Sequence, residues 1–164
     1  MMTKQSYTFH LLLHSAHLLE ERLRSRLVPL GVQPRQARVL DALGRMGQTS
    51  QVKLARDFGL TAASMSTMTT RLLNAGLIER QVDKRELRSN VLTLSPLGQS
   101  LLKKIYHEWQ EIDREIDEII GAEAMAQLGD LTCKLRNAFG GSTPGDKDVL
   151  ESTLVPSSSP KKSP

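Results

Sequence analysis

The sequence predicts a mainly α-helical protein that contains one β-hairpin. Apolar residues recur at helical spacing through most of the 164-residue chain. Between residues 77 and 94 the pattern changes to alternating apolar and polar positions on either side of a charged centre. Glycines and helix-capping residues divide the helical pattern into separate elements. This length corresponds to one domain, or to one domain with an appendage.

The first predicted helix runs from about Tyr7 to Leu30. Its apolar residues are Phe9, Leu12, Leu13, Ala16, Leu19, Leu23, Leu27 and Leu30. This face is wider than one small domain needs, so we expect part of it to pack against a partner helix. A second helix is predicted from Pro34 to Met46, with Ala37, Val39, Leu40 and Leu43 turned inward.

Two short helices joined by a tight turn come next. Ser50 is the expected cap of the first, which runs to about Phe58, and Gly59 can take the left-handed conformation that ends it. Thr61 is the expected cap of the second, whose buried stripe is Met65, Met68 and Leu72. This arrangement predicts a helix-turn-helix.

The opposite face of the second helix is small and polar. It carries Ala62, Ala63, Ser64, Ser66, Thr67, Thr70 and Arg71. None of these side chains is bulky enough to keep the helix out of a DNA major groove. Hydroxyls can bond to base edges or phosphates, and an alanine methyl can touch a thymine methyl. These residues, with Ser50 and Thr61, are predicted to contact double-stranded DNA.

A two-stranded wing is predicted to follow, from residues 77–82 and 91–94 around the charged tip 83–90. Lys84, Arg85 and Arg88 lie at the tip and are added to the predicted DNA contacts. An arginine there can enter the minor groove beside the major groove read by the helix. Asp83 and Glu86 are predicted to support the wing, because a carboxylate can hold Arg88 in position.

Beyond the wing, a long helix is predicted from Pro96 to about Ile120, followed by a break at Gly121. Its apolar stripe is Leu97, Leu101, Ile105, Ile112, Ile116, Ile119 and Ile120. A final helix from about Glu123 to Ala138 carries Met125, Leu128, Leu131 and Leu135. The first and last helices of two copies could form one interface. Residues 140–164 are rich in glycine, proline and serine and are predicted to be a disordered tail.

Four signatures occur in order: Gly31–Leu40, Leu54-Ala55, Gly76–Arg80, and Glu86-Leu87-Arg88 with Leu94–Gly98. Together they resemble the MarR-type transcriptional regulators. That family usually has Asp where this chain has Glu86, Leu-Thr where it has Leu94-Ser95, and often a capping Thr at Gln33.

The resemblance implies a homodimer built from four segments. Residues 1–30 form the N-terminal dimerisation helix, 31–95 the winged helix-turn-helix lobe, 96–139 the C-terminal dimerisation helices and 140–164 the tail. It implies a ligand-responsive repressor that reads a pseudo-palindromic operator, with half-sites roughly 10 base pairs apart. Tyr106, His107 and Trp109 are then candidates to line a pocket for a small aromatic or phenolic effector, although ordinary packing explains them equally well.

The distribution of charge agrees with DNA binding. The formal net charge is only +4, but basic residues outnumber acidic ones between Ser50 and Asn90. The balance reverses between Glu108 and Asp130, where Arg114 is the lone basic residue. The wing is therefore expected to face phosphate and the later helices to face away.

Cysteine and histidine offer two other candidate sites. One cysteine, Cys133, excludes an internal disulfide and suits a reducing compartment; we expect it to be a packing residue rather than a peroxide sensor. His10, His14 and His17 have a spacing that could present imidazoles to a metal. No further ligands complete a site, so solvated or interface histidines are preferred and no metal or cofactor is expected.

The sequence contains no signal peptide, membrane span, phosphate-binding loop or nucleophile motif. We therefore expect a cytoplasmic protein that is not an enzyme. The alternative functions are a winged-helix protein-interaction module and an architectural DNA binder without sequence preference.

Overall fold

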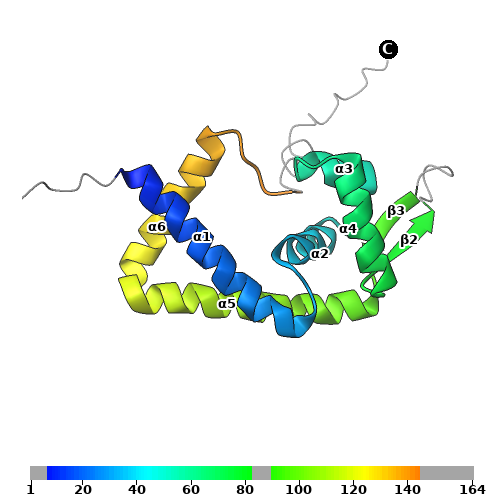
Figure 1. The fold of residues 1–164 in the computed structure, drawn as a ribbon, viewed down its shortest axis with the longest axis horizontal. Coiled ribbons are helices and arrows are strands. Elements are labelled where there is room, and N and C mark those ends of the chain that lie inside the picture. The colour runs from blue at the N-terminus through cyan, green and yellow to red at the C-terminus, as the bar shows by residue number, and fades with distance from the viewer. Residues whose placement is uncertain (1–6, 83–89, 145–164) are drawn as a thin grey trace, which may run out of the picture.

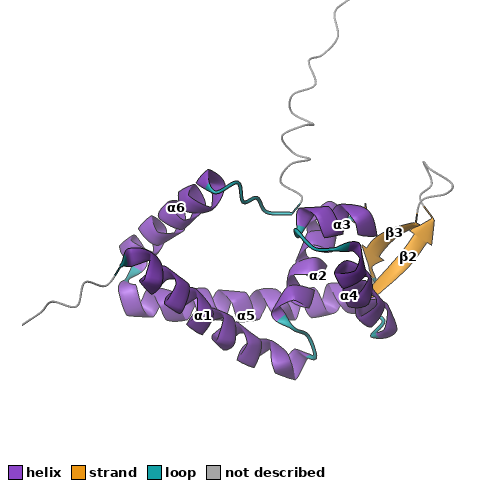
Figure 2. Ribbon diagram, turned by 45° about the horizontal axis from the view of Figure 1, so that its top comes forward, coloured by secondary structure: helices purple, strands orange, loops and turns teal. Residues whose placement is uncertain are grey.

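The computed structural model describes residues 7–82 and 90–144. These residues form two lobes joined by the long helix α5 (Pro96–Ile120), as Figures 1 and 2 show. The winged lobe holds α2 (Pro34–Met46), α3 (Gln51–Asp57), α4 (Ala62–Asn74) and a small sheet. The helical lobe holds α1 (Thr8–Leu27), α6 (Ala122–Ala138) and the second half of α5. The predicted mainly helical class is confirmed.

The first helix ends earlier than predicted. α1 stops at Leu27, and a short 3-10 turn, η1 (Val28–Leu30), completes the segment that was expected to be α-helical. Pro29 has no N–H to donate to the Ser25 carbonyl, so the α-helical hydrogen-bond pattern cannot continue. Gly31, at φ 74°, then turns the chain toward α2.

The hydrophobic core lies mainly in the winged lobe. Ala37, Val39, Leu40 and Leu43 of α2 are all buried, as predicted. They pack in one cluster with Leu54, Met65, Leu72, Ile78, Leu92, Leu102 and Ile105 from α3, α4, the sheet and α5. Because every element of the lobe contributes to this cluster, burial of apolar surface fixes the relative positions of its helices.

The sheet has three antiparallel strands where the sequence predicted two. β1 (Gln48–Ser50) pairs with β3 (Asn90–Leu94), which also pairs with β2 (Ile78–Val82), in the order β1-β3-β2. Thr49 lies opposite Leu92, and Arg80 lies opposite Leu92 on the other side. β1 is too short for a periodic signal, and it forms only because the wing strand offers its free edge.

Helices α5 and α6 begin and end close to their predicted bounds. Gly121, at φ 84°, separates them as expected. The predicted apolar stripe of α5 is wrong at three positions, since Leu97, Ile119 and Ile120 are exposed. Leu102, outside that stripe, is buried instead. The first half of α5 packs on α2 and β3 while its other end lies in the helical lobe, so no single face is buried along its whole length.

Two arginines of α1 join it to α5. Arg22 donates to the two carboxylate oxygens of Glu115 at 2.9 and 2.8 Å. Arg26 contacts the same carboxylate and also donates to Glu108 at 3.0 Å. Hydrogen bonds from Arg22 and Arg26 lower the pKa of Glu115 to about 2. Two of the acidic residues of α5, Glu108 and Glu115, are therefore engaged in ion pairs within the protomer.

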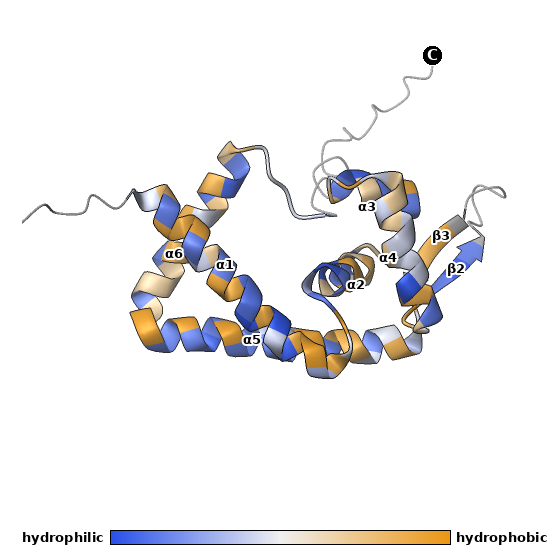
Figure 3. Ribbon diagram, viewed as in Figure 1, coloured by the Kyte–Doolittle hydropathy of each residue, from blue (hydrophilic) through white to orange (hydrophobic). Residues whose placement is uncertain are grey.

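The helical lobe leaves much apolar surface uncovered. Phe9, Leu12, Leu13 and Leu19 of α1 and Leu128, Leu131 and Leu135 of α6 are exposed. Figure 3 shows hydrophobic positions recurring along both helices. Cys133 of α6 is also exposed, so its expected burial is wrong for the single protomer, and its role as a packing residue stays a prediction. Within the described ranges, no helix is long and apolar enough to cross a bilayer.

Candidate nucleic-acid interface

Helix α4 presents the polar face that the sequence predicted. Thr61 caps its first turn, accepting a hydrogen bond from the Ser64 backbone N–H at 3.1 Å. Met65, Thr69 and Leu72 are buried beneath. The residues left exposed are Ala62, Ala63, Ser64, Thr67, Thr70 and Arg71, while Ser66 is half-buried. The predicted inner and outer faces of this helix are therefore correct, apart from Met68, which is only half-buried.

The exposed hydroxyls are held in defined directions. Thr67 Oγ1 donates to the Ala63 carbonyl at 3.1 Å, and Thr61 Oγ1 donates to Ser64 Oγ at 2.9 Å. Because the Thr67 proton is engaged by its own helix, its oxygen faces outward as an acceptor. The outward groups of the helix are therefore small, and they offer both hydroxyl oxygens and methyl groups.

The turn between α3 and α4 sets the position of α4. Ser50 accepts a hydrogen bond from the Lys53 N–H at 3.2 Å and so caps α3, as predicted. Gly59, at φ 61°, takes the expected left-handed conformation, and the Leu60 N–H bonds to the Ala55 carbonyl at 2.9 Å. Thus the helix-turn-helix forms from local signals that the sequence displays.

A buried polar contact that the sequence did not indicate joins these two helices. Thr69 is fully buried, and its Oγ1 lies 3.0 Å from Gln51 Oε1. The same hydroxyl lies 3.0 Å from the Met65 carbonyl. The position of Thr69 between Met65 and Leu72 on the buried stripe is the sequence feature that could have predicted its burial. Thr69 therefore acts as a positioning residue between α3 and the exposed face of α4.

Exposed arginines lie on α4 and on the neighbouring elements of the winged lobe. Arg71 of α4 and Arg80 of β2 are exposed, as is Arg56 of α3. Arg38 of α2, which was not singled out in the sequence, has its guanidinium 5.6 Å from the centre of the Phe58 ring at the end of α3. This stacking holds a charge beside the turn of the helix-turn-helix. The predicted wing residues Asp83, Lys84, Arg85, Glu86 and Arg88 lie outside the described residues.

The start of α5 is fastened directly to the segment that follows α4. Ser95 caps α5 through the Gly98 N–H at 3.0 Å, while its hydroxyl donates to the Gly76 carbonyl at 2.6 Å. The Ser95 N–H also bonds to the Leu77 carbonyl at 3.1 Å. A Cβ on Gly98 would lie 1.9 Å from that carbonyl oxygen. The Leu94–Gly98 signature is therefore the joint between the wing and the long helix.

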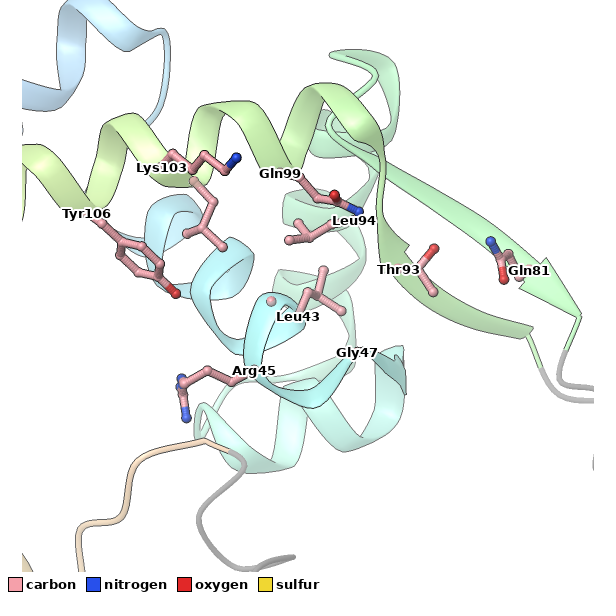
Figure 4. Close-up of a pocket in the computed structure, with 11 residues that line it drawn as sticks. Leu43, Arg45, Gly47, Gln81, Thr93, Leu94, Gln99, Lys103 and Tyr106 are labelled. Atoms are coloured by element: carbon pink, nitrogen blue, oxygen red, sulfur yellow. The ribbon is translucent and has the colours of Figure 1, made fainter.

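A pocket lies between α2, the sheet and α5, as Figure 4 shows. Its volume is about 530 Å³, and its lining includes the polar side chains of Arg45, Gln81, Thr93, Gln99, Lys103 and Tyr106 beside Leu43, Leu94 and Leu102. Tyr106 is the one member of the predicted aromatic group that lines it. Trp109 packs against Tyr106 at 5.7 Å between ring centres, and His107 is exposed.

The other candidate groups do not assemble into a site. His10, His14 and His17 are exposed, and His17 lies 3.6 Å from Glu21. The described part of the chain contains no group of three or more metal-ligating side chains. Cys133 Sγ lies 3.5 Å from Arg136 Nη2 and 3.8 Å from Asn137 Nδ2.

Comparison with known proteins agrees with this geometry. A family model described as the MarR family matches residues 30–89. The HTH-type transcriptional regulator FarR of Neisseria gonorrhoeae is 28% identical over 124 residues, which are 76% of this chain and 85% of FarR.

Solved structures share the fold. A probable transcriptional regulator from Pseudomonas aeruginosa has a TM-score of 0.67 and 26% identity, with 78% of this chain and 96% of that one covered. A mutant of MarR from E. coli, complexed with operator DNA, has a TM-score of 0.67 and 21% identity, with 79% of this chain and 99% of that one covered. The family model over residues 30–89, the relative and the shared fold all point to the MarR family of winged-helix transcriptional regulators.

Proposed function

We propose that this protein is a sequence-specific DNA-binding regulator that binds a pseudo-palindromic operator as a homodimer. The observation that carries the proposal is the exposed face of α4, which is small and polar from Ala62 to Thr70 and has Arg71 near its C-terminal end. A helix of this kind can lie in a major groove with its side chains against base edges. The E. coli protein crystallised with operator DNA has the same fold.

Three parts of the winged lobe have separate roles in this proposal. Ala63, Ser64 and Thr67 of α4 contact base edges, and Thr70 and Arg71 contact phosphates. The wing carries Lys84 and Arg85 to the backbone and Arg88 into the flanking minor groove. Arg80, exposed on β2, extends the positive surface toward that wing. The phosphate contacts set register and the base contacts supply preference.

The homodimer follows from the apolar surface of the helical lobe. Phe9 and Leu13 of α1 are 55% and 65% exposed, and Leu131 of α6 is 63% exposed. Large apolar side chains gathered on two helices at one end of a protomer are typical of a protein interface. Packing this surface against a second copy would hold two α4 helices at a fixed spacing, as a two-fold operator requires.

We propose that a small ligand regulates this activity through the pocket beside Tyr106. Arg45 and Lys103 give the lining positive charge, and Leu43, Leu94 and Leu102 give it an apolar wall. These groups suit an aromatic or phenolic molecule that carries a negative charge. The pocket lies between the winged lobe and α5, so an occupant would change the spacing of the two α4 helices and weaken operator binding. Repression by excluding polymerase, in the cytoplasm, is the proposed outcome.

Fluorescence anisotropy across a salt series tests the proposal. DNA from upstream of the protein's own gene is compared with a scrambled duplex of equal composition. We expect a preference for the native fragment that survives rising salt, because base contacts do not depend on counterion release. Equal binding that collapses with salt would indicate an architectural binder, and absence of binding to any duplex would favour a protein-interaction module.

Two variants assign the roles. Thr67→Ala should change the ranking of operator variants at one position in each half-site, because it removes an outward hydroxyl oxygen from α4. Arg88→Ala should lower affinity by roughly tenfold and reduce the salt slope. Arg114→Ala, which removes a positive charge from the helical lobe, is the control and should bind as the unaltered protein does. An unchanged ranking or affinity would remove that residue from DNA recognition.

A further inference from the structure

A short segment after α6 returns to the winged lobe. Residues 139–144, called here the C-terminal strap, leave α6 through a Schellman motif in which Gly140 takes φ 74°. The Gly140 N–H bonds to the Asn137 carbonyl at 3.0 Å, and the Gly141 N–H bonds to the Arg136 carbonyl at 2.9 Å. The helix end is therefore capped, and the direction in which the strap departs is fixed by its own backbone.

Two arginines hold the C-terminal end of the strap. Arg136 of α6 donates from Nη1 to Thr143 Oγ1 at 2.9 Å. Arg45 of α2 donates from Nη1 to the Pro144 carbonyl at 2.6 Å, and Pro144 is buried. A charged donor to a backbone carbonyl is among the stronger hydrogen bonds, and this one connects the helical lobe to the winged lobe.

Arg45 is itself oriented by a chain of contacts that reaches α5. Its Nε and Nη2 donate to Asp41 Oδ2 at 3.1 and 2.9 Å. Asp41 Oδ1 accepts from the Tyr106 hydroxyl at 2.9 Å. Burial, and then the hydrogen bond to Asp41, raise the pKa of Tyr106, so this phenol remains a donor. One connected set of polar groups thus joins α5, α2 and the strap.

The strap completes a closed ring of elements. Figures 1 and 2 show α5 along one side, α6 rising from its far end, and the strap crossing from the top of α6 to the winged lobe. α5 has 25 residues, a length of about 38 Å. A helix this long bends gently under small forces. The helical lobe already reaches the winged lobe through α5 and through the contact of α1 with α2. The strap adds a direct connection from the end of α6.

We propose that the C-terminal strap is a brace that fixes the orientation of the winged lobe relative to the helical lobe, with Arg45 as its latch. Because Arg45 and Tyr106 also line the pocket beside α5, a group that engages Arg45 competes directly with the Pro144 carbonyl. An effect of the strap on DNA binding rests on the proposed function. The contact between Arg45 and the strap does not depend on that function, and a separate experiment tests it.

Hydrogen–deuterium exchange of the full chain tests the latch. Arg45→Met removes the donors and keeps the aliphatic stem, and it should raise exchange of the strap amides roughly tenfold, as expected for loss of one charge-assisted hydrogen bond. Thr143→Val, which removes the acceptor used by Arg136 and keeps the size of the side chain, should act in the same direction. Arg38→Met removes an equal charge from the same helix away from the strap and is the control.

Exchange within the core of α2, at residues 40–43, should be unchanged in all three variants, which shows that the fold is intact. If the strap exchanges equally in the unaltered protein, in Arg45→Met and in Thr143→Val, the brace does not exist. Faster exchange in Arg38→Met as well would show a general effect of charge and would also overturn the latch.

Addition of the upstream DNA fragment tests the coupling. Linkage is reciprocal, so DNA that selects one lobe orientation must change strap exchange, by about threefold or more, in the unaltered protein. The change should vanish in Arg45→Met, where the strap is already released. DNA that binds without altering strap exchange would overturn the brace. Failure of the protein to bind DNA would overturn the proposed function and leave the exchange test of the latch intact.

Discussion

At the scale of single residues, Gly98 shows how one position sets the junction between wing and helix. Its Cα lies so close to the Leu77 carbonyl that a methyl group would overlap the oxygen, at 1.9 Å. The carbonyl cannot retreat, because it accepts the Ser95 N–H at 3.1 Å. Glycine is therefore required here by close approach of two backbones, and not by an unusual φ.

Gly98→Ala should lower the free energy of unfolding by about 2–3 kcal/mol, because either α5 or the Leu77 carbonyl must move. The matched control is Gly129→Ala in α6, where an added Cβ meets nothing within 4 Å. This control should be neutral or more stable by up to about 1 kcal/mol, through helix propensity. Urea unfolding followed by circular dichroism measures both, and equal stability of the two variants would contradict the argument.

Thr69 is a second single residue whose contact sets the position of an element, here α4 within the helix-turn-helix. Thr69→Val keeps the shape and removes the hydrogen bond to Gln51, so we expect a loss of about 1 kcal/mol of stability and weaker DNA binding. Thr69→Ser should restore both in part, since the hydroxyl returns. Thr132→Val, at an exposed helical threonine of α6, controls for propensity. A fully stable Thr69→Val variant with unchanged DNA affinity would mean that the contact does not position α4.

At the scale of elements, the contact between α1 and α5 depends on ionised carboxylates. Arg22 and Arg26 hold the pKa of Glu115 at about 2, below its value in the unfolded chain. Protons therefore bind the unfolded chain first as the pH falls. The stabilisation is complete above the unfolded pKa of roughly 4.3, and it is lost as the pH drops from about 5 toward 2.

Glu115→Gln should remove that part of the acid sensitivity. The unaltered protein should lose more stability between about pH 6 and about pH 3 than the variant does, as measured by urea midpoints at each pH. Asp113→Asn, at an exposed position on the same helix, is the control and should follow the unaltered protein. Parallel pH profiles for the unaltered protein and Glu115→Gln would show that the pair contributes nothing to folding.

At the scale of the whole molecule, the helical lobe presents its apolar side chains to solvent. A protomer with this much exposed apolar surface on α1 and α6 is expected to associate. Leu13→Glu should convert the proposed dimer to monomers, because it places a charge within that surface. Light scattering after size exclusion measures the mass. Val52→Glu makes the same change at an exposed residue of the winged lobe and should leave the mass unaltered. A dimeric Leu13→Glu variant would place the interface elsewhere.

Much of the fold and of the candidate site was predictable from local pattern. The helices, their caps at Ser50, Thr61 and Ser95, and the polar face of α4 depend on interactions within a few residues. Such interactions leave periodic or positional signals. The end of α1 was misplaced because the signal at Pro29 was outweighed by a continuing apolar pattern.

The missed features all join distant parts of the chain. β1 was absent from the prediction because its pairing partner lies far along the chain, at Val91–Thr93. The predicted stripe is wrong at Leu97, Ile119 and Ile120 because α5 packs on different elements at its two ends. Cys133 lies in an apolar pattern, which predicts burial. Such a pattern does not say whether the same chain or a second chain covers the helix face.

The helix-turn-helix and the residues on the outer face of α4 are encoded locally, since they follow from hydrogen bonding within a few residues and from periodicity. The Thr69 contact with Gln51, the pocket beside Tyr106 and the path of the C-terminal strap to Arg45 became visible only in the folded protein. Each of these features joins residues that lie far apart along the chain. A contact between remote segments depends on the packing of everything between them, and no single stretch of sequence carries that information.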